Sequence, residues 1–321
     1  MSATNFVLDA LDKKILNLLM QNSRMSYTQL AKRTRSSREV AAYRIKKLQD
    51  EGIILEFITE INTEKLGFKL ASVFLSIRTA KETEFKKYLK TCTFAAWTSE
   101  FSGIWNFGVG IYGRSIEEIQ ERFMQIQEQF GTHIAEYRMT LHRTTAQYYE
   151  KYLNITPADK ASQNIKNTTP RIDVKDRIIL KELARNARID CVALAKKTDL
   201  SAVAVAQRIR RLEYSRVIIR YSVFIDPARL GLYQFSVFLR NHHATDRKRL
   251  VPYLAMHPQI SFVIEYVGDP FIECGIIVSD PFDARRIIQE IAGAFPNNQV
   301  VEFFLIQNEI ISIGLPACVF E

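Results

Sequence analysis

The chain repeats itself, and this duplication constrains its fold more than any other feature. Residues 12–67 align without a gap with residues 176–231, at a constant offset of 164. The two aligned segments open at Asp12 and Asp176 and close with Leu66-Gly67 and Leu230-Gly231. A repeat of this kind turns one long folding problem into a shorter one that is solved twice.

The composition indicates ordinary globular domains without a membrane span. Of the 321 residues, 47% are hydrophobic and 25% charged, enough for two or more domains with proper cores. The longest apolar runs, such as residues 300–306, are far shorter than the ~20 residues that a membrane helix needs, and residues 1–5 show no secretory signal. No Cys-x-x-Cys pair occurs among Cys92, Cys191, Cys274 and Cys318. We expect a cytoplasmic protein with free thiols, and neither a metal nor a cofactor.

The net charge of +9 is concentrated in two short segments. Residues 9–52 carry ten Lys and Arg against five Asp and Glu, and residues 173–216 carry eleven against six. Each copy therefore has an excess of five positive charges, and the rest of the chain is close to neutral. Localised basic charge is typical of phosphate binding, although a solvated helical surface would have the same composition.

Apolar spacing predicts three helices at the start of each copy. The first helix of the first copy ends near Asn22 and is marked by an apolar stripe of Leu8, Leu11, Ile15, Leu18 and Leu19. Ser26 and Gln29 have capping-box spacing and predict a second helix that reaches Thr34. A third helix starts at Ser36-Ser37 and stops at Gly52, and its inward residues are Ala41, Ile45 and Leu48.

The second copy repeats this plan with a less polar outward face. Asp190 and Ser201 occupy the capping positions of its second and third helices, and the inward residues of the third helix are Val205, Ile209 and Leu212. The outward residues are Arg38, Glu39, Ala42, Tyr43 and Lys46 in the first copy, and Ala202, Val203, Ala206, Gln207 and Arg210 in the second. Arg216 replaces Gly52, so we expect the end of the helix to differ as well.

After each helical segment the sequence contains runs of β-branched residues, which predict strands. The expected strands are 53–61, 71–79, 95–101, 105–112 and 134–142, and in the second copy 217–225, 235–241, 260–267, 271–278 and 299–306. Amphipathic helices are expected at 82–91, 115–130, 246–256 and 281–295. From residue 71 and from residue 235 onward, this order is βαββαβ, the ferredoxin-like pattern of an α+β fold with both helices on one face of an antiparallel sheet. The other face of each sheet needs a cover, which association of the two sheets would supply.

In this combination the chain resembles the Lrp/AsnC family of feast/famine transcriptional regulators, duplicated in tandem. The residues that carry the resemblance are Asp9, Asp12, Ile15-Leu16, Asn22-Ser-Arg24, Gln29-Leu30-Ala31, Arg44-Ile45, Leu48, Gly52-Ile53-Ile54 and Leu66-Gly67, with Asp173, Asp176, Asn186-Ala-Arg188, Leu194-Ala195, Arg208-Ile209, Leu212 and Leu230-Gly231 in the second copy. The resemblance implies winged helix-turn-helix readers at 1–54 and 171–218, α/β sandwiches of the RAM type at 55–153 and 219–321, and a linker at 154–170. It also implies a pseudo-dimer within one chain, further assembly into homo-oligomers, and association with the nucleoid.

Double-stranded DNA is the partner that the resemblance implies. Each third helix would enter a major groove, since it is held by two others and presents polar or basic residues. Arg38, Tyr43 and Lys46 would read bases or position the helix on the major groove, and Glu39 could accept from a cytosine amine. In the second copy Gln207 would be the best reader, and Arg210 could reach a phosphate or a guanine. The residues expected to hold phosphates are Ser26, Tyr27, Lys32, Arg44 and Lys47, and the further candidates for DNA contact are Ser37, Ser201, Arg208 and Arg211. Arg44 has an alternative, an ion pair with an acidic neighbour inside the unit.

The effector site is where the chain departs from the family pattern. Amino-acid-sensing members have a Gly and, a few residues later, an Asp in the turn between the two middle strands. Here the turns read Gly103-Ile-Trp-Asn106 and Gly268-Asp269-Pro-Phe. Asn106 lacks the charge that would balance an α-amino group, and Asp269 is shifted. These four residues are candidates for binding an amino acid or another small molecule, and the alternative is that both turns are plain hairpins.

The alternative function is enzymatic, because the predicted two-part architecture also resembles that of the sirohaem decarboxylases. Such an enzyme would need histidine and basic residues around a tetrapyrrole, commonly with a histidine on the first strand of the middle hairpin. Residues 95–101 and 260–266 contain no histidine. For His133, His142, His242, His243 and His257 we expect surface or capping roles. A third alternative is a regulator that has lost DNA binding. The basic outward face of the third helix in the first copy argues against it.

Overall fold

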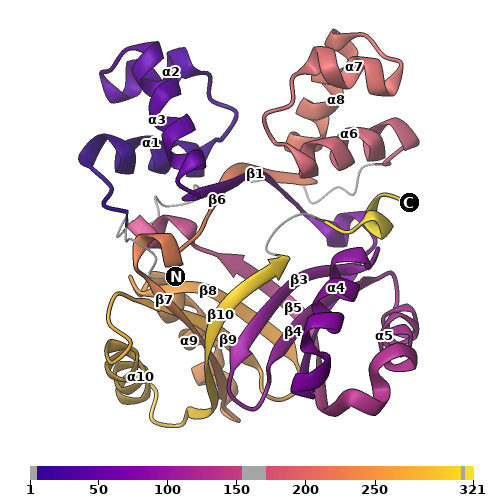
Figure 1. The fold of residues 1–321 in the computed structure, drawn as a ribbon, viewed down its shortest axis with the longest axis vertical. Coiled ribbons are helices and arrows are strands. Elements are labelled where there is room, and N and C mark those ends of the chain that lie inside the picture. The colour runs from indigo at the N-terminus through magenta and orange to yellow at the C-terminus, as the bar shows by residue number, and fades with distance from the viewer. Residues whose placement is uncertain (1–5, 154–170, 312–314) are drawn as a thin grey trace. The chain divides into compact units, whose positions relative to one another are not determined.

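The computed structural model describes residues 6–153, 171–311 and 315–321 (Figure 1). The contacts divide the chain into two compact units, each of which contains parts of both copies. Unit 1 consists of Met1–Phe68, Asp159–Leu230 and Ile313–Glu321, and unit 2 of Lys69–Ala158 and Gly231–Ser312. The division into consecutive domains stays a prediction, and the linker predicted at 154–170 lies outside the described residues.

Unit 1 contains two three-helix bundles with the same plan (Figure 1). The first consists of α1 (Ala10–Gln21), α2 (Tyr27–Thr34) and α3 (Arg38–Asp50), and the second of α6 (Val174–Arg185), α7 (Cys191–Thr198) and α8 (Ala202–Tyr214). The helices begin where the capping residues predict. Ser26 and Gln29 form the expected capping box, and Ser37, Asp190 and Ser201 each accept a backbone N–H at their helix start.

The third helix ends in the same way in both copies, contrary to our expectation for Arg216. Gly52 has φ 69° and Arg216 has φ 57°, so the arginine adopts the left-handed conformation that glycine adopts more easily. The backbone N–H of each donates three residues back, to Gln49 at 2.9 Å and to Glu213 at 3.0 Å. The packing of the scaffold therefore overrides the backbone preference of this residue, at a conformational cost of about 1 kcal/mol.

A two-stranded antiparallel ribbon joins the two bundles. It is formed by β1 (Ile54–Ile61) and β6 (Ile218–Ile225), whose pairing was not evident from the sequence. Ile58 pairs with Ser222, and these two residues occupy equivalent positions in the two copies. The centre of the ribbon is therefore an approximate two-fold axis. Short 3-10 helices follow each strand, at Thr63–Leu66 and Ala228–Leu230, and a last one at Ala317–Phe320 contacts α6.

Unit 2 contains two ferredoxin-like sheets, as the sequence predicts. The first copy supplies β2 (Lys69–Ile77), α4 (Glu82–Thr91), β3 (Ala95–Ser102), β4 (Phe107–Gly113), α5 (Ile116–Phe130) and β5 (Ile134–Gln147). The second supplies β7 (Tyr233–Arg240), α9 (Ala244–Met256), β8 (Ile260–Val267), β9 (Ile272–Val278), α10 (Asp283–Ala294) and β10 (Gln299–Ile311). Short 3-10 helices lie at Thr79–Lys81, Gly131–His133 and Tyr149–Leu153. The strand orders are β3-β4-β2-β5 and β8-β9-β7-β10.

The two sheets join edge to edge into one closed eight-stranded barrel. The last strand of each copy pairs with the other copy, β5 with β8 and β10 with β3. Both last strands are longer than predicted, because their final residues find partners that lie in the other copy. His142 thus lies inside β5 and not at its end. Its imidazole is held between Ser72 Oγ (2.8 Å) and Thr145 Oγ1 (2.9 Å), which corrects the surface role expected for it.

Aromatic side chains from both copies fill the space between the sheets. The buried members of this aromatic cluster are Phe74, Phe101, Trp105, Phe238, Tyr266 and Phe304. Arg138 and Glu302 lie at equivalent positions of β5 and β10 and form an ion pair with each other across the copies. The guanidinium lies over the rings of Phe74, Phe238 and Trp105, and the Trp105 Nε1 donates to Glu302 Oε2 at 2.9 Å. The pair therefore joins the copies at the barrel's own approximate two-fold axis.

The buried acid Glu273, on β9, has no counterpart in the first copy. Gly108 occupies the equivalent place, and a side chain there would collide with Phe101 and Trp97. The Glu273 carboxylate accepts hydrogen bonds from Ser236 Oγ and the Tyr266 hydroxyl. Burial raises its pKa to about 7, against the hydrogen bonds and the Arg138 charge that lower it.

Reversing one charge of the axial pair will destabilise the protein, and reversing both will largely restore it. Arg138→Glu leaves two glutamates at the axis and Glu302→Arg leaves two arginines, so each single change should cost about 3 kcal/mol or more. The double variant exchanges the two residues and re-forms the pair. Urea unfolding of the four proteins gives the coupling energy. Purely additive losses would show that the pair does not join the copies.

Replacing Glu273 by Gln will change how stability depends on pH. A folded-state pKa of about 7 against an ordinary 4.5 means that the native protein binds the proton more tightly, so stability falls as pH rises through this interval. The amide of the Glu273→Gln variant cannot ionise. The stability of the variant relative to wild type should therefore increase between pH 4.5 and 7, by at most about 3 kcal/mol.

Burial lowers the pKa of His142 to about 3, and this group acts in the opposite direction at acidic pH. His142 is present in wild type and in the Glu273→Gln variant, so the difference in unfolding free energy between these two proteins reports on Glu273 alone. Urea unfolding at pH 5 and pH 8 measures that difference, and an equal difference at both values would contradict the assignment.

Candidate nucleic-acid interface

The outward face of α3 is exposed as the sequence predicts. Arg38, Glu39, Tyr43 and Lys46 are all exposed, with Tyr43 64% accessible, whereas Ala41, Ile45 and Leu48 are at most 1% accessible. The helix is thus anchored by one face and presents two cations, one acid and one phenol on the other. These are side chains that can hydrogen-bond base edges and phosphates.

Two serine hydroxyls of the first bundle lie at helix starts, Ser26 before α2 and Ser37 before α3. Ser26 Oγ accepts the Gln29 backbone N–H at 3.2 Å, and Ser37 Oγ accepts that of Val40 at 3.1 Å. The Ser26 hydroxyl hydrogen can donate to a phosphate oxygen, whereas the Ser37 hydroxyl also hydrogen-bonds the Glu39 carboxylate and helps lower its pKa. Lys32 and Arg33 are exposed on α2, and Arg35 is exposed directly after it. Arg33 and Arg35 contribute to the basic excess of the sequence but were not among the predicted DNA contacts. The signal was their position just before the recognition helix.

The corresponding face of α8 is mostly apolar or neutral. Val203 is 68% accessible, and Gln207 and Arg210 are exposed beside it. Ser201 caps the helix through a hydrogen bond from the Ala204 backbone at 3.1 Å. The second face therefore offers one amide and one guanidinium where the first offers four polar or charged groups.

Arg44 and Arg208 are engaged inside their own bundles. Arg44 Nη1 lies 2.6 Å from Asp9 and 3.2 Å from Asp12, and Arg208 Nη1 lies 2.7 Å from Asp173 and 2.9 Å from Asp176. Arg211 also pairs with Asp176. Although burial opposes it, the hydrogen bond from Arg208 helps lower the pKa of Asp173 to about 2. These arginines connect the third helix of each bundle, α3 or α8, to the start of the first helix, α1 or α6. For Arg44 this is the internal ion pair that the sequence offered as the alternative to a DNA contact.

A reciprocal clasp joins the two bundles through the ribbon. Arg24 Nη1 donates to the Ala187 carbonyl and Arg188 Nη1 to the Ser23 carbonyl, both at 2.6 Å. The Arg24 guanidinium lies 5.2 Å from the centre of the Tyr221 ring, and the Arg188 guanidinium lies 5.1 Å from that of Phe57. All these positions are related by the repeat offset. The clasp thus repeats about the axis of the ribbon.

Two of the predicted phosphate contacts take part in internal packing. The Tyr27 ring lies under the Arg188 guanidinium at 5.1 Å, and the Lys47 ammonium lies 5.2 Å from the centre of the Phe6 ring. Both residues are half-buried. Their DNA contacts stay predictions, and Lys32 is the better test of a phosphate contact because it is exposed.

The candidate effector residues lie in unit 2 and have internal partners. Asn106 exchanges two hydrogen bonds with the Ile77 backbone, both at 2.7 Å, and donates to Glu82 at 2.8 Å. Asp269 accepts from Arg240 Nε at 2.7 and 2.9 Å. Gly103 and Gly268 have φ 144° and 105°, which a turn glycine adopts without strain. These contacts favour the hairpin alternative.

Two family models match the helical segments. A winged helix-turn-helix DNA-binding model matches residues 8–54, and a model of the AsnC-type helix-turn-helix domain matches residues 172–213. The two matches coincide with the two bundles of unit 1.

Several curated relatives are transcriptional regulators. The proline dehydrogenase transcriptional activator of Rhodobacter capsulatus is 30% identical over 152 residues, which are 46% of this chain and 99% of the relative. The regulator LrpA of Pyrococcus horikoshii is 31% identical over 125 residues, 38% of this chain and 86% of the relative. An uncharacterized regulator of Pyrococcus furiosus is 44% identical over 66 residues, 21% of this chain. In that last case the chain spans about half the relative's length, 45%.

A similar fold over the whole chain is found in a solved structure of the siroheme decarboxylase NirDL. The TM-score is 0.63, at 13% identity, and the likeness covers 95% of this chain and 94% of that one. At this identity the likeness concerns the fold alone. Within the described ranges, no cluster of His, Cys, Asp and Glu side chains is placed to hold a metal ion, and no helix is long and apolar enough to cross a membrane.

Removing Arg44 will destabilise the first bundle. Arg44→Ala leaves Asp12, whose side chain is only 3% accessible, without its cation, and the loss should be about 2 kcal/mol. Lys46→Ala, on the exposed face of the same helix, is the matched control and should change stability by less than about 0.5 kcal/mol. Chemical denaturation measures both. An Arg44→Ala protein of wild-type stability would return Arg44 to the group of DNA contacts.

Proposed function

Because the chain belongs to the Lrp/AsnC family of helix-turn-helix transcriptional regulators, we propose that it binds double-stranded DNA through two unequal readers. The observation that carries this proposal is the exposed face of α3, where Arg38, Glu39, Tyr43 and Lys46 stand together on a helix anchored by its opposite face. A helix of this kind fits a major groove and can reach base edges. The basic excess of each bundle supports binding to the phosphate backbone.

The two readers are proposed to divide the work. The first reads bases, with Arg38 and Lys46 as donors and Glu39 as an acceptor for a cytosine amine. The second contributes Gln207 as its one base reader and otherwise holds phosphates through Arg210 and the Ser201 hydroxyl. Each chain would then recognise an asymmetric site. A palindromic operator would arise only when two chains pair.

Modulation by a small molecule at the barrel would require a rearrangement of the two turns. Asn106 and Asp269 have internal partners, so a ligand at either turn would have to displace existing hydrogen bonds. A decarboxylase function is not favoured by the interior of the barrel, since aromatic rings from both copies pack there and the neutral His142 is held by Ser72 and Thr145.

Selection of bound fragments from a random DNA pool tests the proposal directly. We expect one preferred, asymmetric sequence per chain, and recovery of no preferred fragment at low salt would contradict the proposal. The same protein should not bind an iron tetrapyrrole, which absorption spectroscopy checks.

Two substitutions separate base reading from phosphate binding. Arg38→Ala should weaken binding to the selected site more than to random DNA, by about 1–3 kcal/mol. Lys32→Ala should weaken both equally and reduce the slope of log affinity against log salt by about one. Fluorescence anisotropy at several salt concentrations measures both effects. Equal losses on selected and random DNA for Arg38→Ala would contradict base reading by this residue.

A further inference from the structure

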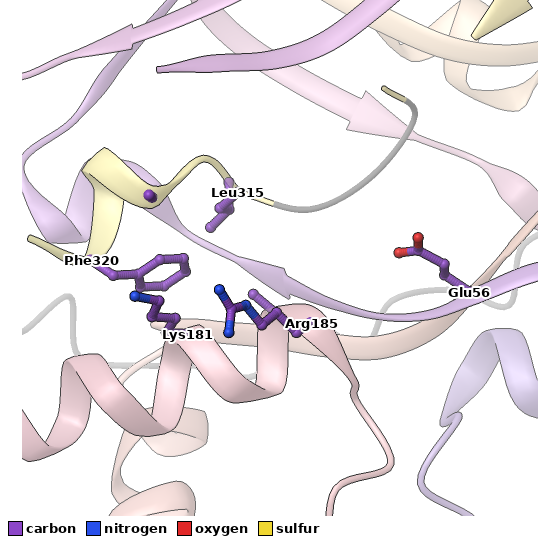
Figure 2. Close-up of a pocket in the computed structure, with 7 residues that line it drawn as sticks. Glu56, Lys181, Arg185, Leu315 and Phe320 are labelled. Atoms are coloured by element: carbon purple, nitrogen blue, oxygen red, sulfur yellow. The ribbon is translucent and has the colours of Figure 1, made fainter. Parts of the chain in front are cut away.

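Unit 1 contains a cavity of about 300 Å³ that the DNA-reading function does not use. Its walls are helix α6, strand β1 and the C-terminal segment (Figure 2), and its lining residues are Glu56, Lys181, Ala184, Arg185, Leu315, Ala317 and Phe320. A volume of this order suits a small molecule. The walls combine charges of both signs with an apolar, partly aromatic surface.

Opposite charges line this cavity without neutralising each other. Among the described residues, Lys181 forms neither a hydrogen bond nor an ion pair, and the same holds for the carboxylate of Glu56. The second cation, Arg185, lies one helical turn after Lys181 and has only a long contact with Glu182, at 3.8 Å. In Figure 2 the Glu56 side chain stands apart from both cations, on a different wall. Glu56 and Arg185 are exposed and Lys181 is half-buried, so the three charges lie at the open side of the cavity. Partial loss of hydration raises the pKa of the Glu56 carboxyl.

The other copy shows that the scaffold does not require these charges. The residues equivalent to Lys181 and Arg185 are Asn17 and Gln21, which are neutral and hydrogen-bond to each other. Arg220, the equivalent of Glu56, pairs with Glu60 at 2.6 Å across the ribbon. Glu56 instead faces Phe224 in the strand register. The unpaired charges are thus particular to one side of unit 1.

The C-terminal segment covers this side. Cys318 and Val319 are buried, and the Val319 carbonyl accepts a 3.5 Å hydrogen bond from Arg177 of α6. This contact holds Leu315 and Phe320 over the helix, where they supply the apolar part of the lining. A ligand in the cavity would touch α6, β1 and the segment together.

We propose that this cavity binds a small zwitterion whose apolar body separates an acidic group from an ammonium group. The acidic group would meet Lys181 and Arg185, the ammonium group would meet Glu56, and the body would contact Leu315 and Phe320. Since α6 belongs to the second reader, the ligand would stiffen the support of that reader. This last consequence depends on the proposed DNA-binding function, whereas the binding site itself does not.

Titration calorimetry of the full chain without DNA tests the site with three probes. These are 4-(aminomethyl)benzoate, benzoate and benzylamine, which carry both charges, the acid alone and the ammonium alone. We expect 4-(aminomethyl)benzoate to bind most tightly and benzylamine most weakly. Lys181→Met should weaken 4-(aminomethyl)benzoate about tenfold, the loss of one charge-assisted contact worth about 1.4 kcal/mol.

Two further variants keep the result interpretable. Glu56→Gln should lower the affinity for 4-(aminomethyl)benzoate to that for benzoate. Lys196 is an exposed lysine on α7, and Lys196→Met should leave the affinities for both compounds unchanged. Equal affinity for all three probes, or equal effects of Lys181→Met and Lys196→Met, would overturn the proposal. Because no DNA is present, such a failure leaves the DNA-reading function untouched.

Discussion

The structure depends on how equivalent residues meet where the two copies face each other. In a homodimer, a residue on the two-fold axis meets an identical residue, so an arginine would face an arginine. Here both copies lie in one chain, and position 138 can differ from position 302. Arg138 and Glu302 use this freedom to form an ion pair over three aromatic rings inside the barrel. The pair also discriminates between partners, because two first copies would place two guanidinium groups together in a poorly hydrated interior.

Several contacts within the two bundles show the opposite behaviour and are kept in duplicate. The clasp of Arg24 is repeated by Arg188, and the ion pairs of Arg44 are repeated by Arg208. Each of these contacts joins two different groups, and the same two groups meet again in the other copy. Symmetry therefore brings no like charges together, and a change in one copy would not improve the contact. The scaffold of the two bundles therefore stays the same while the exposed faces of α3 and α8 change. The proposed unequal readers on equal supports are an arrangement that a duplicated chain can have and a homodimer cannot.

The sequence predicted features that depend on neighbouring residues, and missed those that depend on the other copy. Helix starts follow from Ser26, Ser37 and Ser201, because capping is a local interaction, and the exposed face of α3 follows from the spacing of three apolar residues. The lengths of β5 and β10, the ribbon and the closure of the barrel require knowledge of which strands meet. His142 was misplaced for this reason. Arg216 was misjudged because packing imposed a left-handed conformation that residue preference alone opposes. For Arg44, the sequence offered two partners, and only the distance to Asp9 and Asp12 distinguishes them.

Covalent linkage also explains how a reader with few base contacts can be useful. A non-specific contact to DNA has a dissociation constant of roughly 10⁻⁴ to 10⁻⁶ M at physiological salt. Once the first reader is bound, the second is confined near the same duplex at an effective concentration on the order of millimolar. The second reader would then be bound most of the time through phosphates alone. Under the proposed division of work, Val203 and Gln207 would not need to discriminate strongly, because the first reader would already have chosen the site. Selection for sequence would accordingly act mainly on α3, and α8 could lose polar residues without loss of occupancy.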